Sequence, residues 1–263
     1  MRIDRGNDLG DMEYMRLDRK EDIEQICRQV AEIVMKAAGL SFRDEIRVNR
    51  KGHGNFVSEA DLEIEAYLLR KLHDLLPEAG FISEETDPNA REDYNWIIDP
   101  IDGTTNYLFG YPYALSVALK DEKTQETVIG VIYAPASEEL YYACRGTGSY
   151  RQERSGDIQK LQVRWQDEEG VVIFGMPYNR EKTGKILLLA EQYYKHASDL
   201  KRIGPASLDI CRVASGRAKL YVELDLQIWD VAAGVLILNE AGGYCEKRGD
   251  VWLFWGRSRK DER

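Results

Sequence analysis

The sequence contains few of the side chains that build zinc sites or disulfide frameworks. It has three histidines and four cysteines among 263 residues, and no two cysteines form a C-x-x-C pair. These residues are His53, His73, His196, Cys27, Cys144, Cys211 and Cys245. Because a structural zinc site needs closely spaced ligands, we expect neither a zinc site nor a disulfide framework.

Long apolar segments are also missing. The longest apolar run, from Val231 to Leu238, is far shorter than the roughly 20 residues that a membrane span requires. Charged residues recur throughout Met1 to Lys20, so this segment does not match the apolar core of a secretion signal. We therefore expect a cytoplasmic protein with no membrane partner.

Basic residues are outnumbered by acidic ones. Lysines and arginines number 36 and aspartates and glutamates 46, for a formal net charge of -10. This excess of negative charge disfavours nucleic acid as a partner. An acidic protein that binds an anionic substrate needs local positive charge, and bound metal ions are one source of it.

The length suits one domain built from two packed halves, roughly 12–165 and 166–256, with mobile ends at 1–11 and 257–263. Apolar spacing predicts a first helix over 23–37 and a short strand over 46–48 before a glycine-rich turn at 51–55. Ser58, followed three residues later by Asp61, indicates the start of a second helix. We expect its buried face to consist of Leu62, Ala66, Leu69 and Leu72.

Two sheets are predicted by the rest of the chain. Short strands at 81–83 and 96–98 precede a meander over 114–119, 128–133 and 140–143. Strands at 171–174, 200–203 and 219–222 then alternate with helices over 185–194, 205–214 and 229–241. The last helix is apolar nearly all round, so we expect it to lie buried between layers.

The segment from Trp96 to Pro112, WIIDPIDGTTNYLFGYP, concentrates the residues that suggest chemistry. Pro100 restricts the backbone between Asp99 and Asp102, so both carboxylates can turn toward one point beyond a strand. A cation such as Mg²⁺ would relieve their repulsion. The next residues, Gly103 to Thr105, resemble a helix start that can bind an anion. Taken alone, the segment also fits a capped turn, but it lacks the spacing of an EF-hand or a P-loop.

Three motifs together resemble the inositol monophosphatase family, which belongs to the lithium-sensitive, metal-dependent phosphatases that include fructose bisphosphatases. They are Ile82–Thr86, Trp96–Pro112, and Ile228–Gly234 with Glu240–Gly243 after it, and the resemblance extends roughly over 23–243. It implies an α+β fold, a layered αβαβα sandwich with two mixed or antiparallel sheets, and a homodimer. Relatives usually continue through a further strand and helix after the last motif, so we expect the end of the second sheet to be incomplete.

The resemblance also implies a set of metal ligands. They are Glu84, Asp99, the backbone carbonyl of Ile101, Asp102 and Asp230, which would hold two or three Mg²⁺ ions with Asp99 as the bridge. Two such cations can hold a phosphate and activate a water molecule. Without the other motifs, Asp230 would be interpreted as a helix-capping acid.

For catalysis, the resemblance implies direct attack of water on phosphorus, with the water oriented by Thr104 and Glu84 and the phosphate bound at Gly103 and Thr104. The aspartate that usually partners this threonine is Asn55 here, which keeps hydrogen-bonding capacity but has no charge. Asp61 is an alternative partner, although its spacing matches a separate downstream acid of the family.

The resemblance assigns the polyol to Glu223 and to the backbone of Ala206, with Asp209 shaping the wall. The expected reaction is hydrolysis of a small polyol phosphate monoester, with myo-inositol monophosphate as the leading substrate. Thr105-Asn106 differs from the Lys-Glu pair of relatives acting on adenosine 3′,5′-bisphosphate, which disfavours a nucleotide. Two alternatives stay open: a sugar bisphosphatase, and a weakly active, phosphatase-like regulatory or binding protein.

Overall fold

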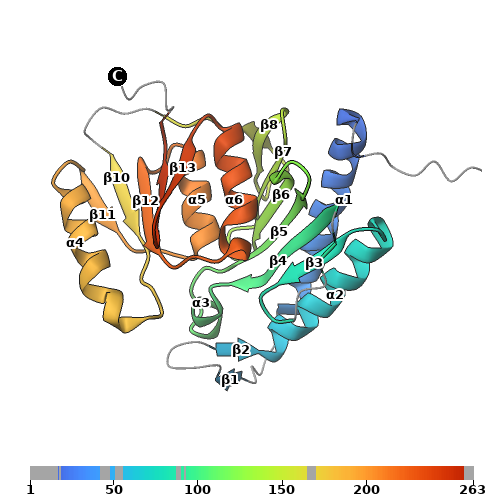
Figure 1. Ribbon diagram of the computed structural model, residues 1–263, viewed down its shortest axis with the longest axis horizontal. Helices are drawn as coiled ribbons and strands as arrows, with labels where there is room; N and C mark the ends of the chain where they lie inside the picture. The colour runs from blue at the N-terminus through green and yellow to red at the C-terminus, as the bar shows by residue number, and fades with distance from the viewer. Residues whose placement is uncertain are drawn as a thin grey trace, which may run out of the picture.

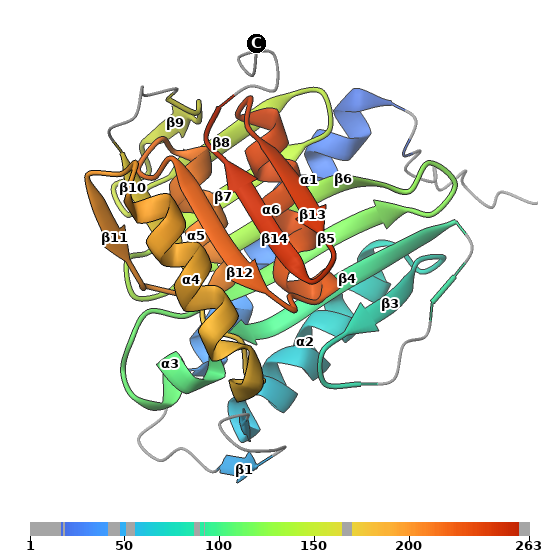
Figure 2. The ribbon, with the colours of Figure 1, turned by 60° about the vertical axis from the view of Figure 1, so that its left-hand side comes forward.

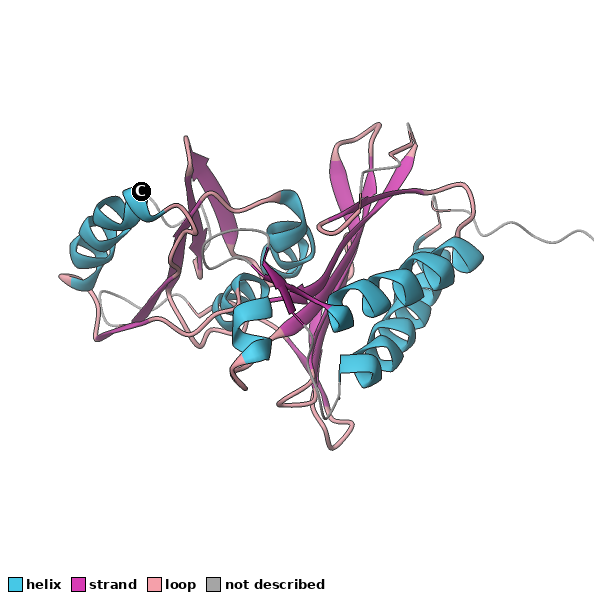
Figure 3. Cartoon of the chain, turned by 90° about the horizontal axis from the view of Figure 1, so that it is seen from below, coloured by secondary structure: helices cyan, strands magenta, loops and turns pink. Residues whose placement is uncertain are grey.

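The chain folds into five layers in which helices and sheets alternate, an α+β sandwich of order αβαβα (Figures 1 and 3). This computed structural model describes residues 17, 19–41, 48–50, 56–86, 90–91, 93–164 and 170–257. A seven-stranded sheet and a five-stranded sheet are separated by two helices and flanked by others. This arrangement confirms the fold class that the sequence predicts.

The first sheet keeps its strands in chain order, and only its first pair is parallel. Its strands are β3 (Gly80–Ser83), β4 (Tyr94–Asp102), β5 (Ala114–Asp121), β6 (Glu126–Ala134), β7 (Glu139–Cys144), β8 (Gly148–Gln152) and β9 (Ile158–Lys160). The predicted meander corresponds to β5, β6 and β7. On one face of this sheet lie α1 (Lys20–Ala38) and α2 (Glu59–Leu75).

The second sheet has the strand order β11-β10-β12-β14-β13. Its strands are β10 (Val171–Phe174), β11 (Asp199–Lys201), β12 (Leu220–Leu224), β13 (Tyr244–Arg248) and β14 (Val251–Trp255). The first three are parallel, and β14 pairs antiparallel with β12 and β13. Figure 2 shows α4 (Thr183–Tyr194) lying across the outer face. Sequence analysis did not predict the β13–β14 hairpin, which makes β12 an interior strand of the sheet.

The start of α2 was predicted correctly, but its buried face only in part, since Leu72 is buried and Leu69 partly buried, whereas Leu62 and Ala66 are not. Ser58 and Asp61 form a capping box, in which the Ser58 amide donates to Asp61 Oδ2 at 2.8 Å. Leu62 is 46% exposed and Ala66 is also exposed. The buried stripe is Ala60, Ile64, Leu68 and Leu72. Two overlapping apolar stripes exist in this helix, and packing against β4 selects the second one.

Some predicted features lie outside the described residues. They are the glycine-rich turn at 51–55, the chain ends 1–11 and 258–263, and most of the strand expected at 46–48. The described strand there, β1 (Val48–Arg50), pairs antiparallel with β2 (Phe56–Ser58).

Between the two sheets lie α5 (Ala206–Ala214) and α6 (Ile228–Glu240). A Cβ atom at Gly130 of β6 would lie 2.8 Å from the Ala233 carbonyl oxygen, and one at Gly234 would lie 2.9 Å from Ile210 of α5. Glycine therefore permits this close packing, and α6 is buried as its apolar sequence predicts. Among the described residues, no helix is both long and apolar enough to cross a membrane.

Candidate active site

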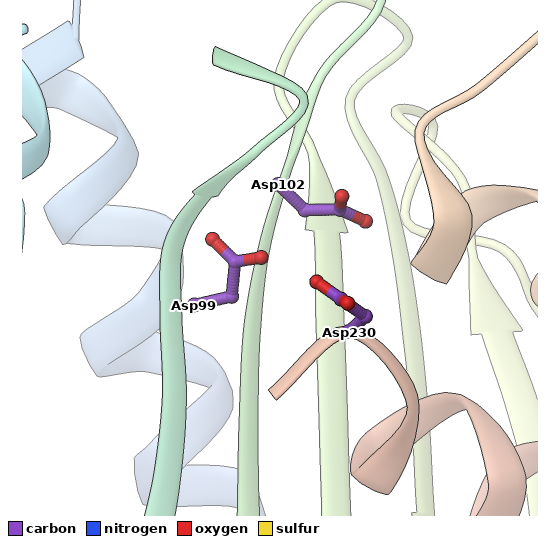
Figure 4. Close-up of side chains that lie close together, drawn as sticks. All are labelled: Asp99, Asp102 and Asp230. Carbon is purple, nitrogen blue, oxygen red and sulfur yellow. The ribbon is translucent and has the colours of Figure 1, made fainter. Parts of the chain in front are cut away.

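A bulge in β4 brings two aspartates to the same side of the strand (Figure 4). Asp99 pairs with Ser116 and Asp102 with Ala114, so β4 has one more residue than β5 over this interval. In a regular strand, residues three apart point to opposite faces, and one extra residue reverses that relation. Pro100 lies inside the bulge, where its missing N–H breaks no regular pairing.

A third aspartate reaches the same point from the other half of the chain. Asp230, in the first turn of α6, has a ligand atom that lies within 4.8 Å of one from each of Asp99 and Asp102. The Gln227 amide donates to Asp230 Oδ2 at 2.6 Å, so this residue also caps its helix. The capping interpretation and the site interpretation of Asp230 are therefore compatible.

The electrostatics of this cluster favour a bound cation. Asp99 is 1% exposed, and its Oδ1 is buried with no hydrogen-bond partner among the described residues. Burial, followed by the charges of Glu84, Asp102 and Asp230, raises the pKa of Asp99 well above its usual range. Burial also raises the pKa of Asp102 to about 6 and that of Asp230 well above its ordinary value. Because the clustered donors are all carboxylate oxygens, they fit a hard cation such as Mg²⁺.

Glu84 borders the three aspartates without belonging to their tight group. It follows β3, where its amide donates to the Ile98 carbonyl at 3.3 Å, and its charge raises the pKa values of Asp99 and Asp230. Behind it, buried Glu65 of α2 accepts hydrogen bonds from Ser83 and Thr86, two residues that flank Glu84 and Glu85. Sequence reasoning missed Glu65, although its place one helical turn after Asp61 puts it on the same side of α2.

Thr104 is held by two acceptors. Its hydroxyl donates to Asp61 Oδ1 at 3.2 Å and also lies 3.3 Å from the Ile101 carbonyl oxygen. Asp61 is thus a carboxylate partner of Thr104, the alternative raised by the sequence. Asn55 lies outside the described residues. Gly103 has a φ of +86°, and a Cβ atom built at this position would lie 2.9 Å from Pro205. There is therefore little room here for a residue other than glycine.

Residues at the start of α5 also contact the cluster. The backbone N–H groups of Ala206 and Ser207, at the start of α5, hydrogen-bond Asp102, with Ser207 N to Oδ2 at 2.7 Å. Asp209 instead accepts from the Gly204 amide at 2.8 Å and pairs with Arg212.

Glu223, at the end of β12, is half-buried. The Tyr221 hydroxyl hydrogen-bonds its carboxylate, and burial raises the pKa of Glu223 to about 7. The charge of Glu223 also contributes to raising the pKa of Asp230, so this acid lies near the aspartate cluster. Sequence reasoning missed Arg202, whose charge opposes the rise in the Glu223 pKa, and it missed Tyr178.

The layered fold, with its acidic site where the two halves meet, places the chain in the structural class that fructose bisphosphatases share with their metal-dependent phosphatase relatives. The sequence profile of the inositol monophosphatase family matches residues 18–256, and the chain belongs to that family.

Proteins similar to this chain carry two kinds of name. An inositol-1-monophosphatase of Mesorhizobium japonicum is 38% identical over 226 residues, which are 82% of each chain. A putative Nus factor SuhB of Neisseria meningitidis is 33% identical, over 86% of this chain and 87% of the relative.

Solved structures agree with this assignment. The extragenic suppressor protein SuhB of Bartonella henselae has a TM-score of 0.79 and 32% identity, covering 90% of this chain and 94% of that one. The inositol monophosphatase of Anabaena has a TM-score of 0.77 and 26% identity, covering 91% and 94%.

Proposed function

We propose that this protein hydrolyses the phosphate monoester of a small polyol in a Mg²⁺-dependent reaction, with myo-inositol monophosphate as the leading substrate. One observation carries the proposal: Asp99 and Asp102, which are buried, and the partly buried Asp230 converge from β4 and α6 into one cluster of like charge. Family membership supports the phosphatase reaction. Assay of the purified protein against a panel of phosphate esters, with and without Mg²⁺, tests it.

The residues that would hold two or three Mg²⁺ ions are Glu84, Asp99, Asp102, Asp230 and the carbonyl of Ile101. Bound cations supply positive charge to the phosphate and lower the pKa of water. In this assignment Glu84 and Thr104 orient the attacking water, and the Gly103 and Thr104 backbone binds the phosphate. Ala206 and Glu223 face the polyol from the other half of the chain.

The Thr104–Asp61 hydrogen bond predicts a selective effect of Asp61→Asn. This change removes the negative charge of the group that accepts the Thr104 hydrogen bond. Because general-base assistance is typically worth about 10²- to 10⁴-fold, kcat should fall at least about 10-fold. Ser58→Ala is the matched control, because it weakens the α2 cap but leaves the Thr104 partner, so it should lower the melting temperature with kcat retained. Equal losses of kcat in both variants would mean that Asp61 acts only as a cap.

The Asn55 position provides the complementary test. If the missing charge limits turnover, Asn55→Asp should raise kcat at saturating Mg²⁺ and change the pH profile. If Asp61 already serves Thr104, the rate and the profile of Asn55→Asp should match the wild type. We expect the second outcome, because the Asp61 carboxylate already accepts from Thr104.

Glu223→Gln should affect substrate binding more than turnover. Glu223 lies near the end of β12, in the second sheet, whereas Thr104 follows a strand of the first sheet, and the proposed role of Glu223 is to accept a polyol hydroxyl. Loss of one hydrogen bond to a charged group costs about 1.5–3 kcal/mol, so KM for inositol phosphate should rise roughly 10-fold or more. Steady-state kinetics with inositol phosphate and with a sugar bisphosphate would show whether the substrate ranking changes. An unchanged KM would remove Glu223 from the polyol wall.

A second candidate function is a regulatory or binding role with weak turnover. Relatives named Nus factor SuhB, at 33% identity, favour it. A sugar bisphosphatase is a further alternative, since its metal site would be the same. The ester panel separates these cases. Strong turnover of inositol phosphate supports our proposal, and strong turnover of a bisphosphate supports a sugar bisphosphatase. The absence of turnover for every ester supports the regulatory role.

We also propose that the protein forms a homodimer. Phe109 and Tyr111, just after α3 (Thr104–Leu108), and Ile203, before α5, are large apolar residues exposed at 69%, 64% and 37%. Contiguous exposed apolar patches mark interaction sites, and we assign these three residues to such a patch at the dimer interface. Sedimentation analysis should give twice the chain mass of 30.2 kDa, and Phe109→Ser with Tyr111→Ser should restore the monomer mass.

A further inference from the structure

Tyr178 lies in the segment that connects β10 to α4, next to the proposed polyol wall. The strands β10 and β12 are parallel neighbours, with Phe174 paired to Val222, so their carboxyl ends meet at one edge of the second sheet. In open α/β sheets, the crevice outside the carboxyl ends of parallel strands is the usual place for ligands. Glu223 and the 175–178 segment both lie at this edge.

The backbone leading to Tyr178 runs directly against Glu223. The Gly175 amide donates to the Val222 carbonyl at 3.0 Å, and a Cβ atom at Gly175 would lie 1.8 Å from the Glu223 carboxylate. Glycine is therefore required for this approach. Two residues later, buried Pro177 fixes the chain before Tyr178.

The other end of the segment is also anchored. Lys182 forms ion pairs with Asp225 at 2.6 Å and with Asp250 at 2.9 Å, which tie it to the chain after β12 and to the β13–β14 turn. Asn179 caps the short 3-10 helix at Arg180–Lys182. Tyr178 thus extends from a segment held at both ends, so its position is defined before a ligand binds.

Tyr178 is near enough to the aspartate cluster for those charges to act on its hydroxyl, although the residue as a whole is 62% exposed. Burial of the hydroxyl, followed by the charges of Glu84, Asp102, Asp230 and Asp99, raises the pKa of Tyr178. A tyrosine hydroxyl is protonated at neutral pH and is therefore a donor, and this one has no hydrogen-bond partner among the described residues. The Tyr178 hydroxyl thus offers a free hydrogen-bond donor beside an acidic site, and its ring is open to solvent. Both features suit a ligand that supplies a hydrogen-bond acceptor and an apolar face.

We propose that Tyr178 is a substrate-binding and specificity-determining residue, whose hydroxyl donates to the phosphate and whose ring packs on the carbon face of a cyclic polyol. The inference rests on the proposed phosphatase function and deepens it, because it predicts a preference for cyclic over acyclic polyol phosphates. Glu223 accepts hydroxyl protons on one side of the polyol, and the Tyr178 ring covers another. Aromatic rings contribute a large apolar area with little conformational freedom to lose.

Two substitutions separate the hydroxyl from the ring. Tyr178→Phe keeps the ring, and should weaken binding of inorganic phosphate in saturating Mg²⁺ by about 10-fold or more, as measured by calorimetry. It should raise KM by a similar factor for inositol 1-phosphate and for the acyclic ester glycerol 2-phosphate. Tyr178→Ala should add a further loss of about 5-fold in kcat/KM for the cyclic ester only.

Tyr194→Phe and Tyr194→Ala are matched controls. Tyr194 is the last residue of α4, is 50% exposed, and lies at the opposite end of this helix from the Tyr178 segment. These variants should leave phosphate affinity and both KM values at wild-type levels, and melting temperatures should show that all four proteins fold.

The outcomes distinguish this inference from the proposed function. Wild-type hydrolysis with unchanged phosphate affinity and KM in Tyr178→Phe would overturn the role of Tyr178 alone. Phosphate binding that depends on Tyr178, without turnover of any ester, would overturn the phosphatase function and support the role of Tyr178. A wild-type protein that neither binds phosphate with Mg²⁺ nor hydrolyses an ester would overturn both.

Discussion

Exhaustive chelation should abolish phosphate release, and Mg²⁺ should restore it. Without a cation, Asp99, Asp102 and Asp230 place several buried like charges within one small volume, and no described cationic side chain belongs to the cluster. The phosphate would meet the same repulsion, so turnover should fall to the background rate. Treatment with EDTA followed by a Mg²⁺ titration measures this dependence, and Li⁺ should inhibit the restored activity. Full activity after chelation would contradict the metal assignment.

The same experiment has a readout in stability. Burial raises the pKa of Asp102 to about 6, whereas the ordinary pKa of an aspartate is 3.8. The free energy of unfolding of the metal-free protein should therefore decrease as the pH rises through this interval. Mg²⁺ should consequently raise the melting temperature more at about pH 8 than at about pH 5, where protons already neutralise part of the cluster. An equal shift at both values would mean that the cation binds elsewhere.

Asp99→Asn should lower kcat by at least about 1,000-fold, equivalent to about 4 kcal/mol of transition-state stabilisation. Asp99 is the most deeply buried of the three clustered aspartates, and one of its oxygens has no hydrogen-bond partner among the described residues. We assign it as a ligand of the Mg²⁺ that the site would hold, so its loss should displace metal as well as reduce turnover. Steady-state kinetics over a wide range of Mg²⁺ concentrations measures both effects.

Stability should change in the opposite direction. Replacing a buried, repelled carboxylate by a neutral amide should raise the melting temperature of the metal-free protein and reduce the further gain from Mg²⁺. Asp74→Asn is the matched control, because this exposed aspartate of α2 lies on the surface, where it should leave both kcat and the Mg²⁺ response unchanged. A modest loss of kcat in Asp99→Asn, similar to that of Glu223→Gln, would contradict the division between metal and substrate residues.

Local patterns predicted those parts of the fold whose signals lie within one segment. Ser58 and Asp61 start α2 because a capping box needs only four consecutive residues. The apolar sequence of α6 predicted its burial, since every face of that helix must avoid water. The β13–β14 hairpin was missed because the motifs that guided the predictions end at Gly243. No strand was therefore predicted over 244–255.

The candidate site also separates features that the sequence predicted from features that only the tertiary structure shows. Proline between Asp99 and Asp102 indicated that the two carboxylates could meet, and the structure gives the reason as a one-residue bulge against β5. The partner of Thr104 was left open between Asn55 and Asp61, because the family's partner position falls on the uncharged Asn55, whereas the spacing of Asp61 matches a separate acid. Only the packing of α2 on the first sheet brings Asp61 within hydrogen-bond distance.

The sequence by itself determined which residue types are available, the order of the motifs, and the family to which they belong. Tertiary structure alone decided the buried face of α2, the approach of Gly175 to Glu223, and the position of Tyr178 beside acids from the other half of the chain. The physical reason is that periodicity and capping are short-range properties of the chain. The convergence of residues separated by most of the sequence depends on how two sheets pack on the helices between them.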